Sequence, residues 1–278
     1  MKKILFSSLL FISLSVSAQY YYSDIIGTNE TATTIKLYKQ NKVNQVVLNS
    51  YDGDGTKSDA FFVEQTFSPT TNTLKTITRS GITSASILTT FFNEKGQVSK
   101  TIDSSDALVN TMIYTYDNEG LLINVQQSSI DSANVFSQFE EHQWQYEKGK
   151  VSKLIRIKNK KDTSIVQFKL DEAGNIAEEQ SFINGKASEP VYYYYDDQNR
   201  LTDIVRYNNK VRKLLPEYMF EYSKSNQVIQ KITVPSNNSD YLIWRFQYDN
   251  RGLKIKEAIY NKQKQLNGKI EYIYSFSS

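Results

Sequence analysis

Few residues of this chain could carry out chemistry. It contains one histidine, His142, and no cysteine. A serine–histidine–aspartate triad or a multi-histidine metal site would have to form around this single imidazole, and thiol nucleophiles, thiolate zinc sites and disulfides are excluded. His142 alternates in phase with Trp144 and Tyr146, so we expect it to pack within or at the rim of an aromatic face.

Paired carboxylates could hydrolyse glycosidic bonds, and several adjacent pairs occur. Among them are Glu140–Glu141, Glu178–Glu179 and Asp196–Asp197. Neighbouring residues on a strand point to opposite faces, so no such pair can work together on one substrate. A glycan-active enzyme would need carboxylates from distant strands and is only a second alternative. We expect no cofactor, because the sequence has no nucleophile elbow and no phosphate-binding loop.

One stretch has the oxygen-rich composition of a calcium loop. It contains Asp52, Asp54 and Asp59, which are the candidate metal ligands. The same stretch lacks the bidentate glutamate of an EF-hand, and its two Asp-Gly dipeptides are typical of a hairpin turn. The turn is therefore the favoured interpretation and the metal site the alternative.

Tyr192 and Tyr194 are the candidate binding residues. They fall on the strand face that is polar in most of the chain, opposite Tyr193 and Tyr195. Exposed tyrosines could stack on sugar rings or hold a peptide. Ordinary packing at a contact between repeats is the competing interpretation.

A sequence repeat of about 26 residues recurs along the chain, and the elements that it forms must position all these residues. Each copy has an aromatic or apolar anchor at the end of a strand: Tyr38, Phe67, Phe92, Tyr116, Tyr146, Leu170, Tyr195, Tyr222, Tyr248 and Tyr274. A second aromatic, such as Trp144, stands two residues before most anchors, and the residue between is polar. An aspartate such as Asp117 then opens a turn, and a glycine or asparagine such as Gly120 completes it. The sequence predicts a single all-β domain over residues 19–278, an antiparallel meander of about twenty strands in hairpin repeats.

These copies resemble the YD repeats of Rhs-type proteins. That pattern is Tyr-Asp, two variable residues, glycine, a basic residue and an apolar one. The segment Tyr195–Leu201 matches it most closely, with Asn199 in place of the glycine. In that family the repeats curl into a hollow shell that encloses a toxin domain. No cargo domain follows Tyr274 in this sequence, so we do not expect toxin encapsulation.

About twenty strands cannot remain a flat sheet, so we expect a spiralled or flattened barrel-like form. Its aromatic face could point inward in water or outward into lipid. If side chains simply alternate between the two faces, polar residues fall on that face in the departing strands, the strands that follow each turn. They lie two positions after the first apolar residue of these strands: Lys100, Asn124, Lys153, Glu178, Asp203 and Gln230. A charge at mid-bilayer costs about 2–4 kcal/mol, so we expect the aromatic face to point inward and the protein not to insert into membranes.

Residues 1–18 have the form of a secretory signal peptide. Lys2 and Lys3 precede an apolar stretch, and cleavage is expected after Ala18. Loss of these two of the 33 basic residues, against 30 acidic ones, takes the formal charge from +3 to +1, which gives no electrostatic case for a nucleic-acid partner. The peptide and the Tyr-, Asn- and Lys-rich chain resemble exported proteins of the Bacteroidota.

These patterns together favour an exported, non-enzymatic repeat protein. We expect it in the periplasm, at the cell surface or outside the cell, as a binding or structural module with an unknown protein or glycan partner. An outer-membrane β-barrel is the first alternative.

Overall fold

The computed structural model describes residues 20–81, 85–105, 108–131, 133, 137–235 and 240–277. The predicted signal peptide, residues 1–18, lies outside this part of the chain.

One helix and nineteen strands make up the described structure. The helix α1 spans Ser23–Gln40. The strands are β1 (Val43–Asp52), β2 (Lys57–Ser68), β3 (Thr73–Ser80), β4 (Ser86–Phe92), β5 (Val98–Ser104), β6 (Leu108–Tyr116), β7 (Leu122–Asp131), β8 (Ser137–Glu147), β9 (Lys150–Lys158), β10 (Asp162–Leu170), β11 (Ile176–Ile183), β12 (Lys186–Ala187), β13 (Val191–Tyr195), β14 (Leu201–Asn208), β15 (Lys213–Tyr222), β16 (Val228–Thr233), β17 (Leu242–Tyr248), β18 (Lys254–Tyr260) and β19 (Leu266–Phe276).

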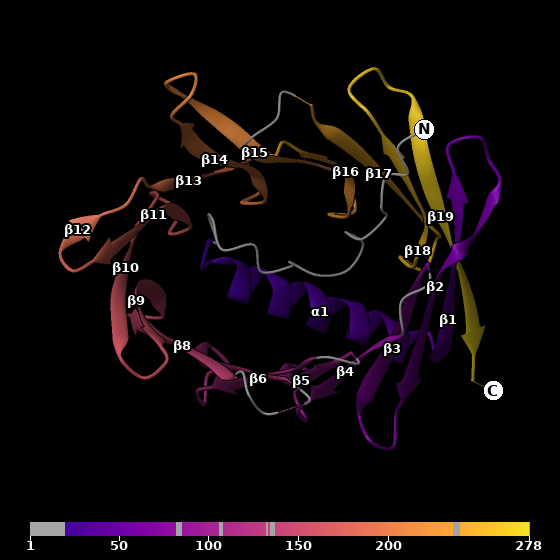
Figure 1. Ribbon diagram of the computed structural model, residues 1–278, viewed down its shortest axis with the longest axis horizontal. Coiled ribbons are helices and arrows are strands. Elements are labelled where there is room, and N and C mark those ends of the chain that lie inside the picture. The colour runs from indigo at the N-terminus through magenta and orange to yellow at the C-terminus, as the bar shows by residue number, and fades with distance from the viewer. Residues whose placement is uncertain are drawn as a thin grey trace.

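The strands form one antiparallel sheet that closes into a barrel (Figure 1). β1 pairs with β19, for example Val46 with Tyr274, and this pairing joins the first and last strands. The short β12 extends the hairpin of β11, and β11 pairs directly with β13, so eighteen strands form the ring. The predicted all-β meander is confirmed, and its barrel-like form is a closed barrel.

The hairpin turns have the predicted form. The N–H of Asp117 donates to the carbonyl oxygen of Leu121 (3.0 Å), and the N–H of Leu121 donates to Asp117 Oδ1 (2.8 Å). Gly120 has φ of +91°, a left-handed conformation that glycine adopts without strain. Asn199 occupies the equivalent position at φ of +58°. The aspartates of the repeat therefore act as turn residues.

The anchor tyrosines join each hairpin to the one before it. The hydroxyl of Tyr116 donates to the carbonyl oxygen of Val98, the first residue of the previous departing strand (2.9 Å). The same bond runs from Tyr146 to Leu122, from Tyr195 to Ile176, from Tyr222 to Leu201, from Tyr248 to Val228 and from Tyr274 to Lys254. Only a hydroxyl-bearing ring makes this bond, which gives a physical reason for tyrosine at these anchors.

A β-bulge after the turn corrects one step of the sequence analysis. Tyr116 pairs with Leu122 but Thr115 pairs with Asn124, so one extra residue intervenes and reverses the alternation of faces. The same shift occurs in six other hairpins. The polar residues assigned to the aromatic face lie on the outer face instead: Lys100, Asn124, Lys153, Glu178, Asp203 and Gln230. The outside of the barrel is therefore more polar than simple alternation predicted.

The assignment of residues 23–40 to a first hairpin anchored at Tyr38 was wrong, because this segment is α1. It has no proline and no Asp-Gly turn, and Lys36 stands where other copies carry an aromatic residue. Threonines fit into the helix because their hydroxyls donate to carbonyl oxygens four residues earlier, as Thr31 does to Gly27 (2.8 Å). Tyr38 is a buried residue of the helix rather than the end of a strand.

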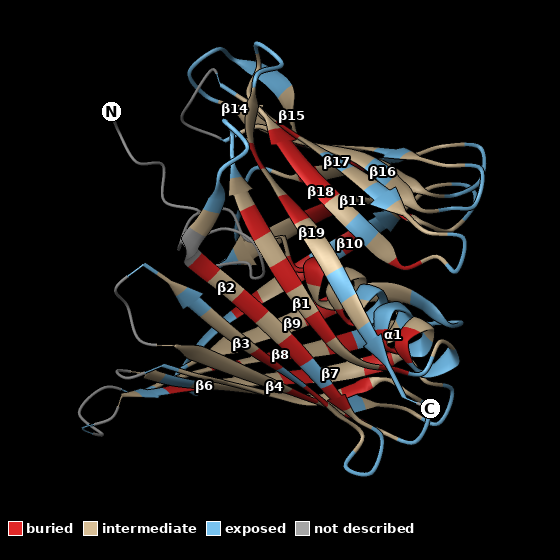
Figure 2. Cartoon of the chain, turned by 90° about the vertical axis from the view of Figure 1, so that its right-hand side faces the viewer, coloured by how far each residue is buried: buried red, intermediate tan, exposed pale blue. Residues whose placement is uncertain are grey.

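α1 lies inside the barrel, and the core forms between the helix and the inner faces of the strands (Figures 1 and 2). Ile35 and Tyr38 belong to one core cluster with residues of β1 and β2. Tyr21, just before the helix, belongs to a second cluster with Trp144 and Phe168. The predicted inward orientation of the aromatic face is confirmed. Within the described residues, no helix has the length and apolar character needed to cross a bilayer.

Candidate functional site

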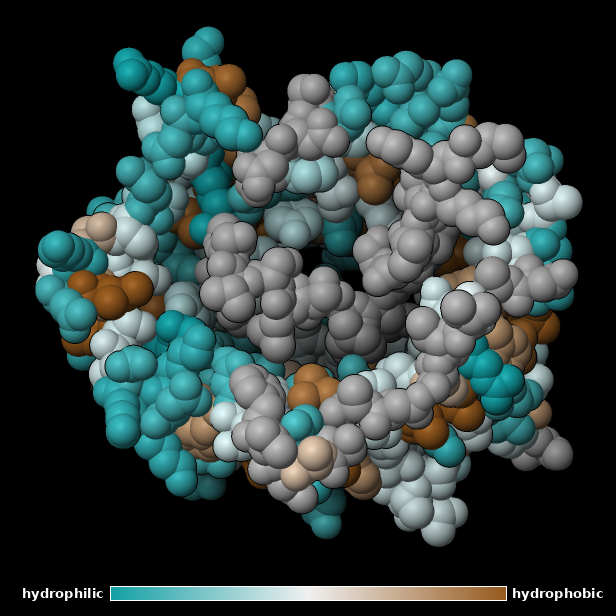
Figure 3. Space-filling view, in the orientation of Figure 1, coloured by the Kyte–Doolittle hydropathy of each residue, from teal (hydrophilic) through white to brown (hydrophobic). Residues whose placement is uncertain are grey.

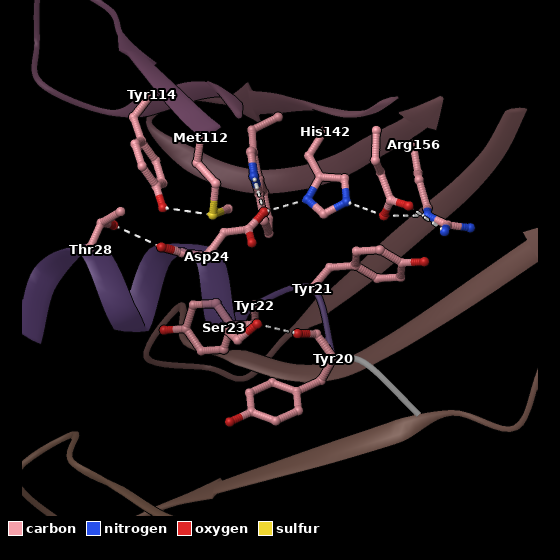
Figure 4. A network of polar contacts seen from close by, with 12 residues as sticks. Tyr20, Tyr21, Tyr22, Ser23, Asp24, Thr28, Met112, Tyr114, His142 and Arg156 are labelled. Atoms are coloured by element: carbon pink, nitrogen blue, oxygen red, sulfur yellow. Dashed lines mark hydrogen bonds and ion pairs between the residues drawn. The ribbon is translucent and has the colours of Figure 1, made fainter. Parts of the chain in front are cut away.

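A chain of charged groups fixes the N-terminal end of α1 to the barrel wall (Figure 4). His142 Nδ1 donates to Asp24 Oδ2 of the helix (2.6 Å), and its Nε2 donates to Glu140 Oε1 (2.9 Å). Arg156 binds both oxygens of Glu140, at 2.7 and 2.6 Å. The indole N–H of Trp144 also donates to Asp24 Oδ2 (3.3 Å). His142 faces the helix because it alternates in phase with Trp144, as predicted.

Electrostatics keep His142 protonated. Burial alone would lower its pKa, but the charges and hydrogen bonds of Asp24 and Glu140 raise the pKa to about 9. Burial likewise opposes ionisation of Glu140, yet His142 and Arg156 lower its pKa to about 2. Both imidazole nitrogens are bound to carboxylates, so neither is free to accept a proton from a substrate. This group holds the helix and does not form a catalytic base.

A second carboxylate holds the residues that lead into the helix. Glu179, only 2% exposed, accepts hydrogen bonds from the backbone N–H groups of Tyr21 (2.8 Å) and Tyr22 (3.0 Å). It also accepts a hydrogen bond from the hydroxyl of Tyr193 (2.7 Å). Its neighbour Glu178 lies on the outer face and pairs with Lys169 (2.7 Å). The predicted opposite orientation of the Glu178–Glu179 pair is confirmed.

Only one side of α1 is packed against the barrel. Ile35 and Tyr38 are buried, whereas Asn29, Glu30 and Thr33, on the opposite side of the helix, are exposed. Because the helix lies within the barrel, these exposed side chains face open space in the lumen. Figure 3 shows the molecule hollowed near its centre.

The wall across this open space is lined by aromatic rings. On β15 and β17 the inner side chains are only half-buried: Tyr218, Phe220, Tyr222, Trp244, Phe246 and Tyr248. The rings of β8, β10 and β13 that cluster with Tyr21, namely Trp144, Phe168 and Tyr193, are at most 9% exposed. The aromatic lining is therefore more accessible on β15 and β17 than where the residues that lead into α1 pack.

Charged groups lie among these rings. Lys231 pairs in register with Phe220 and Trp244, and its ammonium lies 5.4 Å from the ring centre of Tyr218. Lys254 forms an ion pair with Glu257 (2.7 Å).

Lys231 and Glu30 influence each other electrostatically across the lumen. Burial lowers the pKa of Lys231, and confinement within the barrel raises the pKa of Glu30; each charge partly offsets the shift of the other. Within the described part of the chain, neither side chain makes a direct ion pair or hydrogen bond.

Tyr192 and Tyr194 lie on the outer face, as predicted. Tyr192 pairs with Glu178 and Tyr194 with Asp203, and Tyr194 is 49% exposed. A shallow groove of about 510 Å³ runs between these tyrosines and Lys169. Their assignment as binding residues stays a prediction.

The candidate calcium loop forms the turn between β1 and β2. The N–H of Asp52 donates to the carbonyl oxygen of Thr56 (2.9 Å), and Asp54 Oδ1 accepts hydrogen bonds from the N–H and hydroxyl of Thr56. Asp59 belongs to β2, but its side chain lies outside the described set. Among the described residues, no group of three or more acidic, histidine or cysteine side chains could hold a metal. The metal assignment stays a prediction, and the contacts seen are those of a turn.

A smaller cleft of about 260 Å³ opens where the start of α1 meets the hairpin turns. It lies between Ile25 and Asn29 of the helix and the ends of the strands that carry Tyr116 and Tyr146. The hydroxyls of both tyrosines are already bonded to backbone carbonyls.

The positions of Asp24 and Glu30 on a helix were not predicted, because both residues lie in the segment expected to form a hairpin. The absence of any Asp-Gly turn over residues 23–40 was the available indication that this segment differs from the repeats. Lys231 was also missed, since a lysine on a strand is by default a solvated residue.

No protein-family model and no curated protein matches this sequence. Among solved structures, a porin-like protein from Bacteroides uniformis is similar over 84% of this chain and 98% of its own, with 11% identity and a TM-score of 0.43. A Photorhabdus luminescens Tc holotoxin pore is similar over 82% of this chain and 15% of its own, with 13% identity and a TM-score of 0.35. A porin-like protein from Bacteroides vulgatus covers 84% of this chain at 11% identity and a TM-score of 0.26, with 98% of its own chain matched. The resemblance to YD repeats has no support from a family model.

Proposed function

We propose that this protein is an exported, non-enzymatic binding module of the cell envelope or the secreted fraction. The observation that carries the proposal is the arrangement of the barrel's two faces. Polar residues such as Lys169 and Gln145 are exposed outside, whereas aromatic rings line the inside, where α1 covers only one wall. A barrel of this kind suits a protein that works in water and offers both a groove and a lumen to a ligand.

The buried charges argue against catalysis. His142, Glu140 and Asp24 are all engaged with one another, and Glu179 is saturated by donors from the chain. None of these four groups is directed at a space where a substrate could bind, as catalysis by this cluster would require. The glycan-active enzyme is therefore not favoured.

The alternative of an outer-membrane barrel is weakened by the outer face. A membrane strand needs an apolar lipid-facing side along about 9–11 residues. Here the outward strand pairs away from the turns include Gln126 opposite Glu141 and Gln230 opposite Arg245. Charged and polar side chains at this height would make insertion costly.

Export and solubility can be tested with the full chain in a Gram-negative host of the Bacteroidota. We expect recovery from the periplasm or medium without detergent, with an N-terminus at Gln19 by mass spectrometry. Recovery only from the detergent extract of outer membranes would refute the soluble barrel. Retention in the cytoplasm with an intact N-terminus would refute export.

Binding can be tested separately with the purified mature chain immobilised on resin. We expect it to retain protein or glycan from the envelope fraction of its host, and a heat-unfolded sample to retain none. Equal retention by the folded and unfolded chains would refute a specific binding module.

A further inference from the structure

We propose that the open half of the lumen, between α1 and strands β15–β18, is a binding site for a neutral carbohydrate. The inference rests on the proposed binding function and names its ligand class and location. The site is the space bounded by Glu30 on the helix and by Lys231, Phe220 and Trp244 on the wall, called the lumen site below.

The rings of the lumen site supply stacking surfaces. Tyr218 and Phe220 stack on each other at 6.4 Å with planes 11° apart, so β15 presents neighbouring rings in similar orientation. Both are only half-buried. Tyr20 packs edge-on against Tyr218 at 5.9 Å, and the parts of these rings that stay accessible can pack against the apolar faces of sugar rings.

The polar groups of the lumen site match the hydroxyls of a sugar. Lys231 is a donor only and Glu30 an acceptor only, and neither has a direct hydrogen-bond partner among the described residues. A hydroxyl can accept from the first and donate to the second. The ammonium of Lys231 is half-buried and has only a ring beside it, so a ligand that hydrogen-bonds to it is favoured over an apolar one.

The charge balance of the lumen site favours a neutral ligand. The charge of Lys231 is offset by Glu30, and that of Lys254 by its ion pair with Glu257. An acidic ligand would be attracted by Lys231 but repelled by Glu30, and a basic ligand would be attracted by Glu30 but repelled by Lys231. Hydroxyl groups meet no such opposition.

The test is calorimetric titration of the mature chain with neutral hexasaccharides of glucose, xylose and N-acetylglucosamine in both linkage types. We expect at least one to bind and to change the fluorescence of Trp244, one of two tryptophans. Lys231→Met and Glu30→Gln should each weaken that binding at least tenfold. The matched control Lys153→Met, on the outer face and away from the groove of Tyr192 and Tyr194, should change it less than twofold.

Three outcomes would overturn the lumen site. The first is that none of the hexasaccharides binds; if the immobilised chain still retains a partner, the proposed binding function survives without this ligand class. The second is binding unchanged in Lys231→Met and Glu30→Gln but lost in Tyr192→Ala/Tyr194→Ala, which would move the site to the outer groove. The third is binding of a hexagalacturonate at least tenfold tighter than every neutral sugar. Thermal melting of each variant distinguishes lost binding from lost fold.

Discussion

A single substitution at His142 tests whether its charge stabilises the folded protein. His142→Gln removes the cation between Asp24 and Glu140 and leaves two carboxylates buried together. The shift of the pKa from 6.5 to about 9 corresponds to about 3 kcal/mol, at 1.36 kcal/mol per pKa unit. We expect the substitution to lower the free energy of unfolding by this amount at pH 6.

The pH dependence gives a sharper form of the same prediction. Because the folded-state pKa of His142 lies above that of an unfolded histidine, the stabilisation is complete below pH 6.5 and is lost as pH rises through about 9. The wild type should therefore lose about 3 kcal/mol of stability between pH 6 and pH 9.5. His142→Gln should show no such loss.

Urea unfolding followed by circular dichroism at several pH values measures both quantities. As the only histidine of the chain, His142 also gives a single imidazole resonance by NMR, expected to titrate near pH 9. Lys169→Gln, which removes an exposed ion pair, is the control and should cost less than about 1 kcal/mol. A wild-type stability that stays flat from pH 6 to 9.5, or a resonance that titrates near 6.5, would refute the stabilising role of His142 between Asp24 and Glu140.

The remaining predictions concern the repeat and the candidate sites. Gly120→Ala should destabilise the fold by about 1 kcal/mol because of its left-handed backbone, whereas Gly27→Ala in α1 should stabilise it by a similar amount; equal effects in urea unfolding would contradict the turn assignment. Tyr248→Phe should cost about 1 kcal/mol by removing the bond to the carbonyl of Val228, and an unchanged midpoint would show that this bond contributes nothing. Millimolar calcium should leave the melting temperature unchanged if the Asp54 loop is only a turn, and a clear rise would establish the metal site.

The sheet could be predicted from the sequence because each repeat contains the residues that determine its local geometry. Tyr116, Asp117 and Gly120 specify an inward ring, a capped turn and a left-handed residue, and all three occur in the structure. These are local requirements, so they can be read without knowledge of the partner strands. The closure of β1 onto β19 could not be read in this way, because no local pattern links residues more than two hundred positions apart.

The interior of the barrel was predicted less well. A β-bulge cannot be detected from the hydrophobicity pattern. The extra residue Ile123 reverses the alternation of faces, so Asn124 was placed on the wrong face. α1 was missed because threonine is common in strands, and its helical hydrogen bonds depend on the final fold. The contact between Asp24 and His142 joins residues 118 positions apart and follows only from the helix lying inside the barrel.

The position of α1 has a consequence for how the molecule assembles. The helix precedes β1 in the chain, and the wall that surrounds it is completed only when β19 reaches β1. The helix must therefore be seated on the growing sheet before the last seam forms, since a finished ring offers no lateral entry. We expect this seam to be the slow step of folding, because it joins the most distant segments of the chain.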